Sequence, residues 1–237
     1  MTNENSAYFN PTRENAPVSP SDKTVDVYVE TGEKRVFVSA LEWPGWTRSG
    51  KDEKAALEKL AAYATRYAAV PKAARIAFPA GEPRFKVVER VKGNATTDFG
   101  APAIHATGDV KPLSKQEAQR INALLSASWK VFDSVIAKAP AELRKGPRGG
   151  GRDRDKIADH IIDAESAYTP KIGIRMKPPR RDDAVGVQAW RNVIVDTIQA
   201  SAGAPQTGEK RWPPRYIARR MAWHLLDHAW EIEDRST

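Results

Sequence analysis

The chain has 237 residues, a formal net charge of +8 and a sequence pI near 9.6. This length suits one large or two ordinary globular domains, and the basic excess suits an acidic partner such as an anionic metabolite or a nucleic acid. Cysteine is absent, which excludes disulfides, thiolate metal ligands and a cysteine nucleophile. We find no signal-peptide pattern and no apolar run of membrane-spanning length, and we therefore expect a cytoplasmic protein with no membrane association.

The N-terminal third predicts a small α+β domain. Residues 1–23 are rich in Asn, Ser, Pro and charge and predict a disordered lead-in. The alternating "VDVYVE" and the following "RVFVSALEW", separated by "TGEK", predict two strands. Apolar residues at helical spacing within residues 47–70 predict a helix that Ser49 or Asp52 can cap, and "RFKVVERV" predicts a returning strand. We expect a β-β-α-β domain over residues 24–92.

The remainder of the chain predicts helices only. Residues 93–113 contain Gly, Pro and Thr without periodicity and predict a linker between domains. Residues 114–237 then contain four segments with helical spacing of apolar residues, the first opened by the capping-box pattern "SKQE". Connections of 10 to 15 residues between them favour a four-helix bundle with long crossovers. The expected helices cover residues 114–140, 154–171, 183–201 and 214–234.

Three of the four histidines lie on the predicted core stripes of these helices. His224 and His228 are four residues apart on the last helix, on a stripe with Met221 and Ile232, and His160 lies on the stripe of the second helix. Side chains four apart project from one helix face, and burying imidazoles without partners costs roughly 1–3 kcal/mol each. Ordinary core packing is the competing interpretation. We predict that these three histidines bind a metal ion and leave positions open for water or substrate.

The same segments resemble a known superfamily. "DKIADHIIDAESAY" and "ARRMAWHLLDHAWEIEDR" are similar to the DinB-like superfamily, which includes YfiT-type and mycothiol-dependent metalloenzymes. The resemblance covers about residues 114–235 and implies a four-helix bundle whose metal ligands here are His160, His224 and His228. It also implies a divalent ion and, for some members, a low-molecular-weight thiol cosubstrate. Imidazole suits Zn, Ni and Fe alike, so the metal identity stays open.

The first domain resembles a second family. "RVFVSALEWPGWTRSGKDEKAALEKLAAYATRYA" is similar to the HicB-like antitoxin domain, in which a strand runs into a Pro-Gly turn and then a helix. Trp46 stands where a cysteine is common in that family, and the helical segment follows where typical antitoxins have a DNA-binding segment. The resemblance implies a binding module for a protein or nucleic acid. The predicted fold class is therefore α+β, with a HicB-like domain followed by an all-α DinB-like bundle.

Charged residues near the predicted ligands supply further candidates. A carboxylate follows each ligand by three residues, namely Asp163, Asp227 and Glu231. Metal-bound imidazoles usually donate their other N–H to a carboxylate or carbonyl, and we select Asp163 and Asp227 for this role. Solvated ion pairs are the competing interpretation. The arginines that we expect to hold an anionic group of a substrate are Arg148, Arg152, Arg219 and Arg220.

Two hypotheses for the function follow. The first is a divalent-metal-dependent enzyme acting on a small, anionic molecule, either a transferase that uses a small thiol or a hydrolase. A zincin peptidase is excluded, because Leu225 follows His224 where that class needs Glu. The second is a non-catalytic binding or regulatory protein, although no nucleic-acid-binding motif is evident. The substrate, the reaction and the formation of a homodimer stay open.

Overall fold

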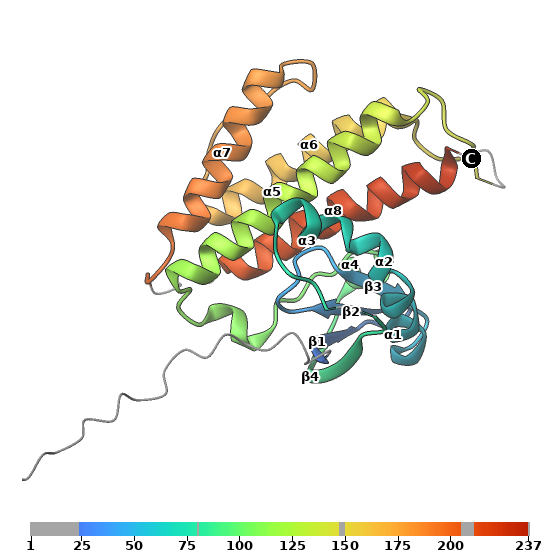
Figure 1. The fold of residues 1–237 in the computed structure, drawn as a ribbon, viewed down its shortest axis with the longest axis vertical. Helices are drawn as coiled ribbons and strands as arrows, with labels where there is room; N and C mark the ends of the chain where they lie inside the picture. The colour runs from blue at the N-terminus through green and yellow to red at the C-terminus, as the bar shows by residue number, and fades with distance from the viewer. Residues whose placement is uncertain (1–23, 80, 147–149, 205–210, 237) are drawn as a thin grey trace, which may run out of the picture.

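The computed structural model describes residues 24–79, 81–146, 150–204 and 211–236. The predicted lead-in, residues 1–23, lies outside the described residues. The fold is of the mixed α+β class, as predicted, with one four-stranded sheet in the N-terminal half and long helices in the C-terminal half (Figure 1). No described helix combines the length and the apolar character that crossing a bilayer requires.

The sheet contains one strand more than the sequence predicted. Its strands are β1 (Thr24–Thr31), β2 (Val36–Ala40), β3 (Thr47–Gly50) and β4 (Arg84–Lys92). Their order is β3-β2-β1-β4, in which β1 and β4 are parallel and the other neighbours are antiparallel. The extra strand, β3, is the segment "TRSG", for which no strand was predicted. Ser49, one of the two residues expected to cap the following helix, lies in this strand, and that alternative was wrong because β2 offers these polar residues a ladder that pairs Val36 with Gly50.

The helix predicted in this half is divided into three. The Asp52 carboxylate accepts a hydrogen bond of 2.8 Å from the amide of Ala55 and caps the first helix. The third helix ends at Arg75, whose φ of 57° is left-handed. Leu60 and Tyr67, which lie among the apolar residues at helical spacing, are fully buried. The helices are α1 (Glu53–Ala62), α2 (Ala64–Tyr67) and α3 (Ala69–Ala74).

The segment predicted as a linker, residues 93–113, contains two helical turns and packs on the sheet. These are α4 (Ala95–Phe99) and η1 (Thr107–Val110). The buried carboxylate of Glu30 on β1 accepts hydrogen bonds from the hydroxyl of Thr97 and from the amides of Ala103 and Ile104. The buried carboxylate and these backbone amides are therefore hydrogen-bond partners of each other. These bonds fix the segment against β1.

The C-terminal half contains four long helices close to the predicted ranges. The capping box is present, with Ser114 accepting from the amide of Glu117 and the Glu117 carboxylate accepting from the amide of Ser114. Apolar side chains from all four helices form one core. A short turn, η2 (Thr169–Ile172), follows the second of them. The helices are α5 (Lys115–Lys138), α6 (Arg154–Tyr168), α7 (Ala184–Ala200) and α8 (Pro214–Arg235).

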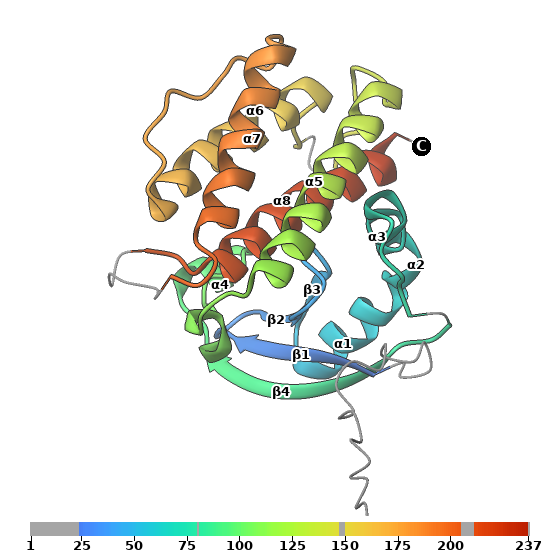
Figure 2. The ribbon, with the colours of Figure 1, turned by 60° about the vertical axis from the view of Figure 1, so that its left-hand side comes forward.

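The two halves share a second core. Figures 1 and 2 show α8 lying between the sheet and the other long helices. Leu226 and Trp230 of α8 are buried in one cluster with valines of β1 and β2, and the ring of Trp223 lies edge-on to Phe37 of β2, with centroids 6.0 Å apart. Helix α8 is therefore buried on two sides, by α5 and α6 on one and by the sheet on the other.

Candidate metal centre

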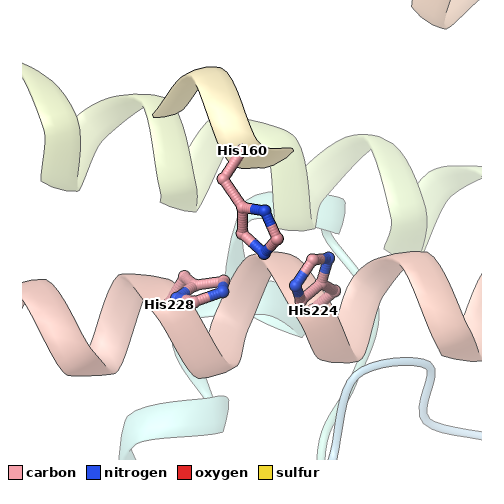
Figure 3. A group of neighbouring side chains, drawn as sticks. All are labelled: His160, His224 and His228. Atoms are coloured by element: carbon pink, nitrogen blue, oxygen red, sulfur yellow. The ribbon is translucent and has the colours of Figure 1, made fainter. Parts of the chain in front are cut away.

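The three predicted histidines converge between α6 and α8. One ring nitrogen from each of His160, His224 and His228 lies within 4.8 Å of the others, and the ring centroids are 4.8 to 5.2 Å apart. Figure 3 shows His160 descending from α6 toward the two rings that rise from α8. Metal–nitrogen bonds are about 2.0–2.1 Å for zinc, so nitrogens up to 4.8 Å apart are near the spacing of a shared ion and have to move closer together to bind it.

Local sequence explains this arrangement. His224 and His228 are four residues apart, and α8 is continuous from Pro214 to Arg235, so both rings leave the same face. On α6, Ile157 and Ile161 are buried in the helical core. Their burial turns the stripe that carries His160 toward α8.

Burial keeps two of the imidazoles neutral. Burial, together with the charges of His228 and Arg220, lowers the pKa of His224 to about 2. Burial and the charge of Arg152 lower the pKa of His160. A neutral imidazole keeps a lone pair for a metal ion. In addition, Nδ1 of His224 is buried and has no hydrogen-bond partner among the described residues, and a metal bond or a shift of the ring would satisfy such an atom.

The third imidazole is oriented by a carboxylate. Nδ1 of His228 lies 2.7 Å from Oε2 of Glu231, whose other oxygen accepts 2.6 Å from a guanidinium nitrogen of Arg235. The hydrogen bond from His228, together with Arg235, lowers the pKa of Glu231 despite partial burial. An ionised carboxylate only accepts, so Nδ1 carries a proton, and Nε2 is the nitrogen of this ring that is left to approach a metal ion. This is the arrangement that orients metal-bound histidines.

The two carboxylates selected from the sequence lie elsewhere. Asp227 forms an ion pair with Arg48 of β3, at 2.8 Å. Asp163 is exposed and acts on His160 through its charge, and no hydrogen bond joins it to a histidine within the described ranges. Glu231 shares their spacing of three residues from a histidine. The spacing was therefore a usable signal, but it did not show which of the three carboxylates faces the rings.

The four arginines that we selected as substrate-binding candidates lie in different places. Arg148 lies outside the described residues. Arg152 is exposed before α6, and its charge acts on His160 and His224. Arg219 points toward the first half, where it forms an ion pair with buried Asp109. Only Arg220 is both buried and close to the centre, with its guanidinium carbon 4.7 Å from the centroid of Trp223.

Aromatic rings enclose one side of the centre. Trp223 is stacked on His224 at a centroid distance of 5.6 Å and an interplanar angle of 16°, and the Tyr168 ring lies 6.1 Å from His224. Tyr168 is the last residue of α6, and no pattern in the sequence connects it with the last helix.

Comparisons of this chain with protein-family models, with curated proteins and with solved structures find no match.

Proposed function

We propose that this protein is a divalent-metal-dependent enzyme with a tris-histidine centre, acting on a small molecule as a transferase or hydrolase of the DinB type. The observation that supports it is the approach of His160, His224 and His228 to within 4.8 Å from two different helices. The chemistry of the set agrees, because three imidazole nitrogens leave coordination positions for substrate.

Each residue at the centre would have its own role in this function. The three imidazoles hold the ion, Glu231 orients His228, and the rings of Trp223 and Tyr168 limit water on one side. A bound divalent ion supplies Lewis acidity that lowers the pKa of a water or thiol ligand or polarises a carbonyl. The chain has no cysteine, so a thiol-dependent reaction would need a small thiol as cosubstrate. The DinB-like bundle and the HicB-like first domain are part of this proposal.

Elemental analysis of the purified full-length protein tests the proposal. We expect about one divalent ion per chain, lost in His160→Ala, His224→Ala and His228→Ala. The fourth histidine is a matched control: His105 contacts the carbonyl of Ala106 through Nδ1, and His105→Ala should retain the ion. A wild-type protein that binds no divalent ion, even after incubation with Zn²⁺, would overturn the proposal.

The non-catalytic alternative predicts a different result. A binding or regulatory protein needs no ion at the histidines, and its basic charge of +8 would act through salt-dependent association with nucleic acid. Metal-free protein that binds nucleic acid with a steep salt dependence, and that shows no turnover with a panel of thiols and esters, would favour that alternative.

A further inference from the structure

A buried arginine lies one helical turn from the candidate metal centre. Arg220 precedes His224 by four residues on α8, so both side chains leave the same face. The guanidinium carbon of Arg220 lies 4.7 Å from the ring centroid of Trp223 and 5.3 Å from that of Tyr168. Both rings also contact His224. Arg220 and the metal ligand therefore share the same aromatic surroundings.

The guanidinium of Arg220 has buried N–H groups that no described residue pairs with. Arg220 is only 7% exposed, and its Nε and Nη1 atoms are buried without hydrogen-bond partners among the described residues. The charge of Arg220 also acts on the hydroxyl of Tyr168, whose ring lies against the guanidinium. Glu30 is near enough for the two charges to interact, but its carboxylate already accepts from Thr97 and from two backbone amides. No ion pair joins Arg220 to a carboxylate in the part of the chain described.

The neighbouring arginine pairs with a carboxylate. Arg219 is also buried, at 4% exposed against 7% for Arg220, and it forms an ion pair with buried Asp109, although its Nε likewise has no hydrogen-bond partner among the described residues. Stacking on aromatic rings stabilises a guanidinium through its faces, but its N–H groups point outward in the ring plane and still need acceptors. A buried cation with unmet N–H groups is costly. The position of Arg220 therefore suits a ligand that brings an anionic oxygen.

We propose that Arg220 binds a carboxylate of the small molecule that occupies the tris-histidine centre. The inference rests on the proposed function and adds the class of ligand: a short molecule with a metal-binding group at one end and a carboxylate at the other. One helical turn separates the two subsites, roughly 6 Å between Cβ atoms. A single guanidinium balances the single negative charge of a carboxylate.

The test uses two thiols that differ in charge. The full-length protein is loaded with Co²⁺, and 3-mercaptopropionate or neutral 2-mercaptoethanol is titrated while the thiolate-to-cobalt absorption is recorded. In the wild type we expect the carboxylate thiol to bind at least about tenfold more tightly. Arg220→Met should abolish this preference and leave the affinity for 2-mercaptoethanol unchanged. The neutral thiol thus reports whether the centre is intact in the variant.

Two further variants make the result specific. Arg152→Met removes the other arginine charge that acts on His160 and His224, but from an exposed position, and should keep the preference. Arg220→Lys keeps the charge without the planar fork and should lose part of it. If Arg220→Met does not bind cobalt, Arg220→Lys is used in its place.

The outcomes separate the two proposals. A preference that survives in Arg220→Met and Arg220→Lys, or that Arg152→Met removes equally, overturns the role of Arg220 and leaves the metal centre standing. Equal affinity of the wild type for both thiols also overturns the role of Arg220 and leaves the metal centre standing. A wild type that binds no cobalt overturns the proposed function and, with it, this inference.

Discussion

Nδ1 of His228 lies 2.7 Å from Oε2 of Glu231, three residues later on the same helix. This contact is the only one between a carboxylate and a candidate metal ligand among the described hydrogen bonds. It fixes the ring and its proton, and it distinguishes Glu231 from the two aspartates at the same spacing, which do not contact an imidazole.

We expect Glu231→Gln to weaken metal binding about 10- to 100-fold, because the amide no longer orients and polarises the His228 ring. Competition with a chromophoric chelator measures the affinity. Asp227→Asn provides the comparison, since Asp227 pairs with Arg48, and its affinity should stay within about twofold of the wild type. Equal losses in both variants would return Asp227 to the role that the sequence suggested.

A second prediction concerns the Pro-Gly turn. Gly45 has a φ of +93°, and a Cβ there would lie 2.5 Å from Cδ1 of Leu226 on α8. Gly45→Ala should therefore cost more than about 2 kcal/mol in free energy of unfolding, from backbone strain and from the clash. Urea denaturation measures it. Two glycines separate the causes, because Gly203 has a φ of +77° with open space and Gly108 has open space without a positive φ.

For those controls we expect an intermediate loss in Gly203→Ala and almost none in Gly108→Ala. If Gly45→Ala were no worse than Gly203→Ala, contact between the turn and α8 would contribute nothing to stability, and the shared core would be less tightly packed than the structure indicates.

The ion pair between the halves should be measurable. Arg48 pairs with Asp227 at 2.8 Å and lies 4.1 Å above the ring of Tyr63. Because the Asp227 side chain is 39% exposed, solvent screens the pair, and a double-mutant cycle should give a coupling of about 0.5–1 kcal/mol. The exposed pair of Lys54 and Glu58 should give no measurable coupling. If the coupling between Arg48 and Asp227 were no larger than that between Lys54 and Glu58, the prediction would be contradicted.

Stability should also depend on a buried acid in the helical half. Burial raises the pKa of Glu165 to about 7, although the indole N–H of Trp129 donates to it at 2.6 Å. The folded protein therefore keeps a proton that the unfolded chain releases near pH 4.5, so stability falls as pH rises from about 4.5 to 7, by roughly 3 kcal/mol in total. Denaturation from pH 5 to 8 should show this loss, and Glu165→Gln should lack it. An unchanged slope in the variant would contradict the assignment.

The helices of the second half were predictable because their sequence pattern is local. The predicted ranges for α5 to α8 differ from the observed ends by at most three residues, since each has a repeating apolar stripe and a capping or Pro signal at its start. β3 was missed because "TRSG" has no alternation and becomes a strand only beside β2. Its register depends on a partner, which no local pattern shows.

The positions of the histidines in the candidate site were predictable from the sequence, but the partners of the surrounding charged residues were not. Spacing alone placed His224 and His228 on one face of a helix. The role of Asp227 could not be predicted, because nothing in the sequence indicates that the sheet packs on α8 and brings Arg48 to this aspartate. The sequence also could not distinguish Arg219 from Arg220 as ligand-binding residues, because it does not show what packs on each side of α8. Adjacent residues on a helix point about 100° apart, and here one faces Asp109 while the other faces the aromatic rings.

The burial of α8 on two sides has a consequence for how the imidazoles are held. The angular setting of this helix about its own axis is fixed by Trp223 against Phe37 on the sheet side and by the helical core on the other. Any substitution in β2 that allowed α8 to roll would carry His224 and His228 away from His160 together. The strands would thus control the spacing of the nitrogen donors without touching them.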